Sequence, residues 1–161
     1  MLYRDILYSF TCLFFSIVAG AAVYEHIAVV PAWSAAPPAS LTMFQGAYGM
    51  NPGPFWQSIH PVTLIFFIIT LITFWKTARR KNVLLAVGGY VLVLVSTAIY
   101  FVPELLHITL TPYADSIDAA LVKRAKMWEL LSLIRLLFIV ALIIVLMLGL
   151  TKNGRRNEVV A

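Results

Sequence analysis

The sequence contains few charged residues, and this shortage argues against an ordinary soluble protein. Only 12% of its 161 residues are Asp, Glu, Lys or Arg, whereas 61% are hydrophobic, and the mean hydropathy is +0.91. A soluble domain carries about 25% charged residues. The polar residues are therefore too few to cover a water-facing surface, and lipid must cover much of the molecule. The length suits one compact bundle rather than two domains.

Cysteine is almost absent, because Cys12 is the only one in the sequence. No disulfide can form within the chain, and there is no CxxC or CxxCH motif. A structural zinc–thiolate site and a c-type haem attachment are therefore excluded. The net charge of +5 would favour a nucleic-acid partner in a soluble protein. Here the basic residues lie beside apolar segments, where positive charge sets membrane orientation, so we expect no nucleic acid.

Four apolar segments approach or exceed the roughly 20 residues that a membrane-spanning helix needs. They run over about 6–30, 59–75, 83–106 and 127–150. The first resembles a signal peptide, but its apolar run continues past the small residues of a cleavage site, so we expect it to remain as a span. Because every backbone polar group must be paired in lipid, the pattern predicts an all-α fold, an integral membrane four-helix bundle.

Lys and Arg are distributed unequally between the two sides of the predicted bundle. Three lie in the connection 109–126: Lys123, Arg124 and Lys126. Eight lie on the other side: Arg4, Lys76, Arg79, Arg80, Lys81, Lys152, Arg155 and Arg156. The positive-inside rule therefore places both termini in the cytoplasm, and we expect a multi-pass protein of a bacterial inner membrane.

The two outer connections, 31–58 and 109–126, are longer than the basic inner link. The first holds five prolines, several aromatic residues and no charged residue. Prolines prevent a long helix, and the aromatic residues favour a place on the bundle or among the headgroups, as an interfacial anchor or as a lid over a site. The second connection predicts a turn at 111–112 and then a short helix capped by Asp115 or Ser116.

Ionisable residues gather at the outer ends of the four spans, where such groups are costly and mark a functional site by default. All three histidines and three of the seven carboxylates lie in this layer: Glu25, His26, His60, Glu104, His107 and Glu129. Imidazole and carboxylate are ligands of iron, copper and zinc, so these six residues are candidate ligands of a transition metal. Glu104 and His107 have the Glu-x-x-His spacing of di-metal sites in four-helix bundles.

Two other interpretations of the same layer remain open. The polar residues form a purely structural network of hydrogen bonds and ion pairs, or they are solvated helix ends whose long side chains reach water. Arg135 lies about 12 Å below the start of the fourth span, where an unpaired charge is costly. We therefore expect a buried structural ion pair between Arg135 and Glu25 or Glu129.

Five stretches carry a resemblance to a known family. They are Tyr24-Glu25-His26, Val30-Pro31-Ala32-Trp33, Ile59-His60-Pro61, Tyr100-Phe101-Val102-Pro103 and Trp128 to Arg135. In these stretches, in length and in its four spans, the chain resembles the small membrane proteins of the anthrone-oxygenase-like family. The resemblance implies oxygenation of a polycyclic aromatic with no metal required, and acid–base roles for His26, His60 and Trp128.

The sequence thus leaves two classes of function. One is a membrane oxidoreductase or oxygenase that acts on a lipophilic or aromatic small molecule at the outer leaflet. The other is a non-catalytic membrane subunit or cofactor carrier, in which two histidines ligate a haem or the polar network is only structural. Membrane lipid is a partner in both classes.

Overall fold

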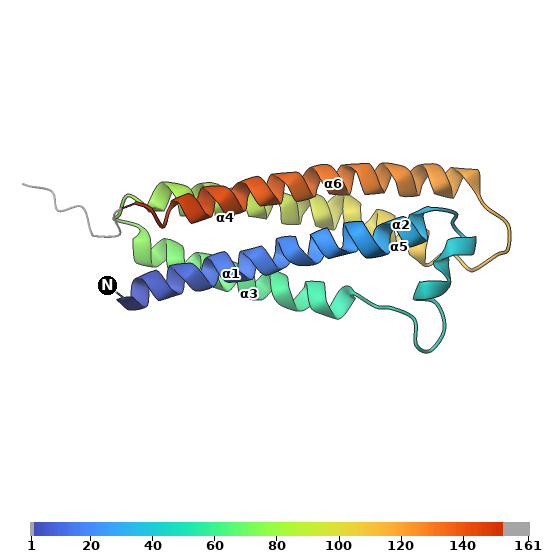
Figure 1. Ribbon diagram of the computed structural model, residues 1–161, viewed down its shortest axis with the longest axis horizontal. Helices are drawn as coiled ribbons and strands as arrows, with labels where there is room; N and C mark the ends of the chain where they lie inside the picture. Colours follow the sequence, from blue (N-terminus) through green and yellow to red (C-terminus); the bar gives the residue numbers. More distant parts are fainter. Residues whose placement is uncertain (1, 153–161) are drawn as a thin grey trace, which may run out of the picture.

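Residues 2–152 of the computed structural model form four long helical rods that pack side by side (Figure 1). The first rod consists of α1 (Leu2–Tyr24), the π-helical segment η1 (Glu25–Val29) and α2 (Val30–Ser34), and the second is α3 (Gly53–Phe74). The third consists of α4 (Arg80–Ser96), the π-helical segment η3 (Thr97–Phe101) and α5 (Val102–Thr109), and the fourth is α6 (Ala119–Leu148). A 3-10 helix, η2 (Ala39–Phe44), lies in the first loop.

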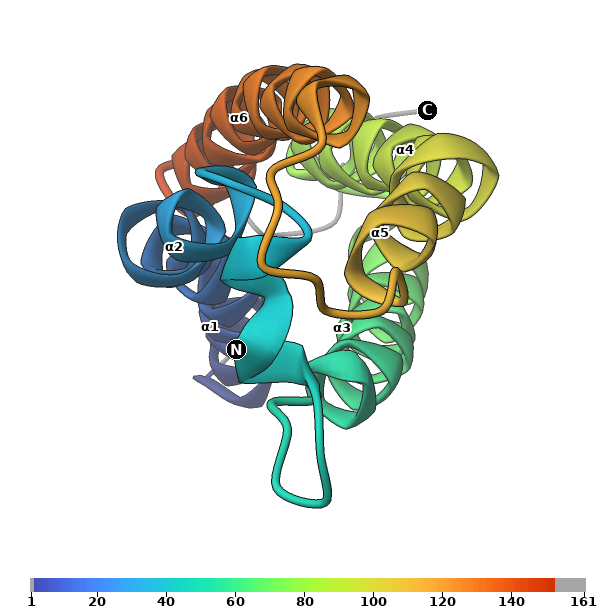
Figure 2. The ribbon, with the colours of Figure 1, turned by 90° about the vertical axis from the view of Figure 1, so that its right-hand side faces the viewer.

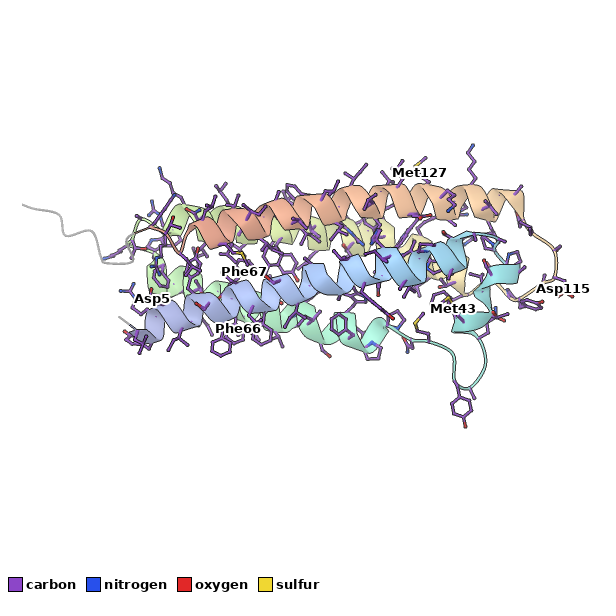
Figure 3. The ribbon with its side chains drawn as sticks, in the orientation of Figure 1. Asp5, Met43, Phe66, Phe67, Asp115 and Met127 are labelled. Carbon is purple, nitrogen blue, oxygen red and sulfur yellow. The ribbon has the colours of Figure 1, made fainter. Side chains whose placement is uncertain are left out.

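Each rod is long and apolar enough to cross a bilayer. Large apolar side chains remain on the outside of the bundle: Ile65, Ile68 and Ile72 are each at least 54% exposed. Figure 3 shows Phe67 directed into the bundle and Phe66 directed away from it. The prediction of an all-α membrane bundle is confirmed, and the chain is a four-span integral membrane helical protein.

Two spans begin earlier than the sequence predicts, which shortens both outer connections. The second span begins at Gly53 rather than near residue 59. The fourth begins at Ala119 rather than near residue 127, because the predicted short helix of the connection 109–126 is continuous with it. In α6, Lys123, Arg124 and Lys126 interrupt the apolar run without ending the helix, because Lys and Arg are good helix formers.

The cap of the fourth span is Asp118, not Asp115 or Ser116. Its carboxylate accepts hydrogen bonds from the backbone N–H groups of Ala120, at 2.7 Å, and Leu121, at 3.2 Å, which have no partner within the helix. Asp115 accepts a hydrogen bond from the Tyr113 hydroxyl instead, and this bond raises the pKa of that phenol above its ordinary value.

Each π-helical segment ends at a Val-Pro pair. In the third rod the Val102 N–H donates to the Thr97 carbonyl, five residues back, and Pro103 follows. The first rod repeats the pattern at Val30 and Pro31. Proline has no N–H, and its ring pushes away the carbonyl four residues earlier, so the turn before it widens.

The two ends of the bundle differ in charge. We call one end the basic end, defined by its residues Arg4, Lys76, Arg79, Arg80, Lys81 and Lys152. We call the opposite end, with the segments 35–52 and 110–118, the loop end. Leu2 and the end of α6 lie together at the basic end, where Figure 3 labels Asp5. Arg155 and Arg156 of the charge count lie outside the described residues, and the cytoplasmic orientation stays a prediction.

The first loop folds back onto the loop end of the bundle (Figure 2). Trp33 and Leu41 are fully buried there. The Asp118 N–H donates to the Pro37 carbonyl at 3.0 Å, so the two loops are also bonded to each other. The loop therefore covers the end of the bundle, a position that fits both the anchor and the lid interpretation.

At the basic end, α1 and α6 make a close contact around Tyr8. Its buried ring packs edge-on against Phe74, with 5.4 Å between centroids, and its hydroxyl donates to the Leu146 carbonyl at 2.7 Å. A Cβ added at Gly149 would lie 1.9 Å from the Tyr8 hydroxyl oxygen. Glycine at position 149 is therefore what allows α1 to approach α6 this closely.

Gly149→Ala should destabilise the bundle by about 1–3 kcal/mol, because the rigid Tyr8 ring cannot move without losing its hydrogen bond. The melting temperature in detergent checks this. Gly88→Ala is the matched control: a Cβ there meets nothing within 4 Å, so helix propensity should leave that variant as stable as the parent or more stable. Equal stability of the two variants would show that α1 and α6 are not in close contact at Tyr8.

A cysteine placed at the exposed Lys81 should be labelled by a membrane-impermeant maleimide only after the cytoplasmic side of the membrane is opened. The native Cys12 is buried and should not react. Labelling of Lys81→Cys in intact cells would reverse the predicted orientation.

Candidate functional site

Inside the loop-end half of the bundle, polar side chains from three rods form what we call the interior cluster: Glu25, His26, Trp56, His60 and Arg135. The Trp56 indole N–H donates to Glu25 Oε1 at 2.9 Å. The same indole stacks on the His60 imidazole, with 5.3 Å between centroids and 24° between planes. His60 Nδ1 shares a hydrogen bond of 2.6 Å with the hydroxyl of Tyr90, whose side chain is fully buried. A continuous chain of contacts thus joins η1, α3 and α4.

His26 has one ring nitrogen bonded and the other free. Its Nδ1 lies 2.9 Å from the Ala22 carbonyl oxygen, which can only accept, so Nδ1 must carry the proton. Its Nε2 is buried and has no hydrogen-bond partner among the described residues. Neutral His26 therefore presents an unprotonated nitrogen to the bundle interior, and buried polar atoms without a partner are rare enough to need an explanation.

Arg135 is held by hydroxyl groups and an aromatic ring rather than by the predicted carboxylate. Its guanidinium donates to Thr97 Oγ1 and Ser132 Oγ, both at 2.9 Å, and lies 3.9 Å from the centroid of the Phe101 ring. Among the ion pairs of residues 2–152, none joins Arg135 to Glu25 or Glu129, so the predicted direct pair is not formed.

The physical reason is that the π-helical segment η3 brings Thr97 and Phe101 to Arg135, while Glu25 is engaged by Trp56. Arg135 still lies within range of charge–charge interaction with Glu25 and with His60. The arginine therefore belongs to the interior cluster, as a nearby positive charge rather than as a bonded partner.

A groove between α4–η3 and α6 opens beside Arg135. It has a volume of about 440 Å³, and its lining is almost entirely apolar apart from Ser96, Tyr100 and Arg135. Leu92, Ile134 and Phe138 form part of its wall and are largely exposed on the face that meets lipid. We call it the lateral groove, because Arg135 lines it and it opens on the side of the bundle.

Glu104 and His107 lie on one face of α5, as their spacing predicts. Both side chains are bound to Arg124 and do not form a shared metal site. Arg124 donates to both Glu104 oxygens at 2.7 Å and to His107 Nε2 at 2.9 Å. Arg124, which the sequence shows only as a charge of the outer side, therefore engages both candidate ligands. The pair lies at the partly exposed surface between α5 and α6, apart from His26 and His60.

Glu129 forms a third separate group, in which one of its oxygens accepts from Ser34 Oγ and from Lys126 Nζ, both at 2.9 Å. The six predicted metal ligands are thus divided between three places. Within residues 2–152, no three His, Cys, Asp or Glu side chains come close enough to hold a metal ion. The donor set does not fit the transition-metal site that the sequence predicts.

Trp128 is buried between two other aromatic side chains. Its ring meets Trp33 at 5.5 Å and Phe101 at 6.1 Å, measured between centroids. Its indole N–H, the only polar group of the side chain, donates to the Phe101 carbonyl at 2.9 Å. This bond pairs a backbone oxygen at the end of the π-helical segment η3, so Trp128 supports the helix rather than presenting a group to a substrate.

Two members of this region escaped the sequence analysis. Trp56 was placed in the first outer connection, although α3 already includes it and puts it four residues before His60, on the same face. Tyr90 is the only tyrosine in the middle of the third span. A buried tyrosine hydroxyl needs a hydrogen-bond partner. A tyrosine in the middle of a span therefore predicts a polar side chain on a neighbouring rod.

Comparison with protein families, with curated proteins and with solved structures finds no match for this chain. The resemblance to the anthrone-oxygenase-like family is therefore a proposal that rests on the residues alone.

Trp128→Phe should destabilise the bundle by about 0.5–1.5 kcal/mol, because it removes the buried hydrogen bond to the Phe101 carbonyl while keeping an aromatic ring in the core. Thermal unfolding in detergent measures this. Trp75→Phe provides the control, since the Trp75 side chain is 48% exposed at the basic end. If both variants unfold at the temperature of the parent, the indole–carbonyl bond does not support η3.

Proposed function

We propose that this protein is a membrane enzyme that takes a lipophilic, weakly acidic aromatic molecule from the bilayer and removes a proton from it within the interior cluster. The observation that carries the proposal is His26 Nε2, a buried nitrogen with no partner among the described residues. A neutral imidazole with a free nitrogen is the usual general base of enzymes near neutral pH.

The surroundings of His26 suit the transfer of a proton. The Ala22 carbonyl fixes the tautomer, so the free electron pair is on Nε2. Glu25 and Glu129 both lie within charge–charge range of His26 and would stabilise the imidazolium that forms when it accepts a proton. The Ala22 carbonyl holds the tautomer of His26, as the carboxylate does for the histidine of a catalytic triad.

Arg135 and the lateral groove suit the other half of the reaction. Removal of a proton leaves a negative charge on the substrate, and a guanidinium with unused N–H groups would stabilise that anion in a water-poor site. Arg135 uses two donors on Thr97 and Ser132, and a guanidinium has five. The apolar lining of the groove favours a ligand that is itself apolar, such as a polycyclic aromatic.

The resemblance to the anthrone-oxygenase-like family implies a reaction that begins with such a proton transfer. A CH₂ group between two aromatic rings, conjugated through them with a ketone, loses a proton to the base. The resulting carbanion adds O₂, and return of the proton gives a hydroperoxide. Loss of water then leaves a carbonyl, so that one O₂ is consumed and one water released for each CH₂ oxidised. The reaction needs a base and a site for the anion, and it is the metal-free form of the oxygenase predicted from the sequence.

The test is turnover of a hydroxyanthrone by the purified protein, followed by O₂ uptake and by the absorption of the quinone product. His26→Gln should lower the rate at least about a hundred-fold, the usual contribution of a general base. His107→Gln is the matched control, because His107 is bound to Arg124 on another surface and its loss should leave the rate unchanged.

The two histidine variants also separate this proposal from a metal site that includes His107, for which both variants would fail and a chelator would inhibit. If the parent protein neither binds nor oxidises hydroxyanthrones, the proposed reaction is wrong whatever the variants do.

A second candidate is a non-catalytic membrane subunit whose polar groups are structural. The observation that favours it is that Glu104, Glu129 and Trp128 all have partners within the chain. In that case His26→Gln should change thermal stability alone. The haem-carrier version of this candidate would give the purified protein a Soret absorption band.

A further inference from the structure

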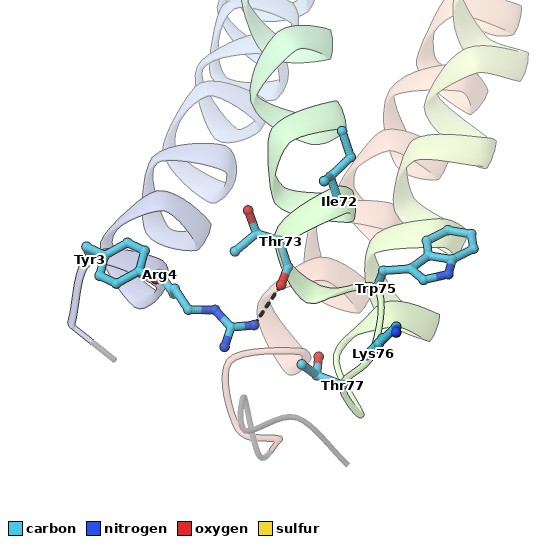
Figure 4. Close-up of a pocket in the computed structure, with 7 residues that line it drawn as sticks. All are labelled: Tyr3, Arg4, Ile72, Thr73, Trp75, Lys76 and Thr77. Carbon is cyan, nitrogen blue, oxygen red and sulfur yellow. Dashed lines mark hydrogen bonds between the residues drawn. The ribbon is translucent and has the colours of Figure 1, made fainter. Parts of the chain in front are cut away.

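A cavity of about 630 Å³ lies at the basic end, far from the interior cluster, where α1 meets the end of α3 (Figure 4). Its lining includes two basic residues and no carboxylate: Tyr3, Arg4, Ile72, Thr73, Trp75, Lys76 and Thr77. Asp5, the carboxylate nearest to it in sequence, is held by Arg79 at 2.5 Å. Among residues 2–152, the lining of the cavity therefore carries positive charge and no carboxylate.

Arg4 is fixed in place at the wall of this cavity. Its guanidinium reaches from α1 to α3 and donates to the Thr73 carbonyl at 2.6 Å, the bond drawn in Figure 4. It also lies over the buried Phe74 ring, 4.8 Å from the centroid. A guanidinium has five donors, and this hydrogen bond uses one of them. The arginine is thus held with donors to spare for an anion.

The other lining residues match the depth at which lipid headgroups lie. α3 ends at Phe74, so Trp75 and Lys76 come just after the apolar span. Tyr3 and Trp75 are both largely exposed, as amphipathic aromatics are at a membrane–water boundary. Ile72, 71% exposed, extends the same surface toward the bilayer interior. One side of the cavity is basic and the other apolar, which is the arrangement of a phospholipid.

We infer that this cavity binds the phosphodiester headgroup of an anionic phospholipid, with Arg4 and Lys76 as its cationic contacts and the acyl chains lying along Ile72. Basic pockets between spans at a cytoplasmic surface bind anionic headgroups in this way. A bound lipid would bridge α1 and α3 at the basic end, where Arg4 is their only hydrogen-bonded link near the cavity among the described residues.

A general attraction between the basic end and anionic lipid is the alternative explanation. It would depend on the total charge and not on which residue carries it. Lys81 distinguishes the two, because it is exposed on the same basic end but does not line the cavity.

The experiment is a titration of the full-length protein with phosphatidylglycerol in detergent, in which native mass spectrometry resolves the first bound lipid. Lys76→Gln should weaken that first binding step about five-fold, the usual factor for one basic residue at an anionic surface. Lys81→Gln should leave it unchanged. Lys76 is exposed and makes no hydrogen bond or ion pair within residues 2–152, so its replacement does not endanger folding.

Arg4→Gln should weaken binding of the first lipid at least as much as Lys76→Gln does. The melting temperature of the Arg4→Gln variant separately measures the effect of losing the hydrogen bond to Thr73. Equal losses in Lys76→Gln and Lys81→Gln would overturn the site in favour of general attraction. Equal binding of phosphatidylcholine would overturn the preference for an anionic lipid. Displacement of the lipid by inorganic phosphate would overturn the lipid assignment and identify a soluble phosphate as the ligand.

Discussion

The structure depends on one constraint, the need to pair every backbone polar group where no water is present. Three prolines lie inside the long rods, and two of them, Pro31 and Pro103, are each preceded by a π-helical turn, whereas Pro61 lies within α3. Beside Pro103, the Trp128 indole N–H donates to the Phe101 carbonyl. Each π-helical segment carries residues of the candidate site: Glu25 and His26 belong to the first, and the contacts of Arg135 come from the second.

The same need for partners governs many of the ionisable residues. Those near the surface find each other, as Arg124 does with Glu104 and His107. Those in the interior use hydroxyl, indole and carbonyl groups, which avoids the cost of bringing two full charges out of water. Within the interior cluster, His26 Nε2 is the atom that is both shielded from solvent and without a hydrogen-bond partner among residues 2–152.

The sequence predicted the number of spans and their helical nature because hydropathy and backbone pairing decide both. It also placed Glu25, His26 and His60 in one half of the bundle, where they lie. It did not separate Glu104 and His107 from them, since residues at equal depth can face opposite sides of a rod, and depth is all that position along a span gives. The partners of Arg135 were missed for a related reason: a π-helical turn rotates Thr97 and Phe101 in a way that a 3.6-residue period does not describe.

The π-helical turns also bear on how this chain accommodates changes in length. A turn closed by a bond five residues back holds one residue more than an α-helical turn. Removing a single residue from 97–101 would therefore leave an α-helical turn and keep the direction of α5, whereas the same deletion within α4 would rotate everything beyond it by about 100°. In an alignment of related chains, one-residue gaps beside the two Val-Pro pairs would record such events, and α5 would present the same face to α6 on either side of the change.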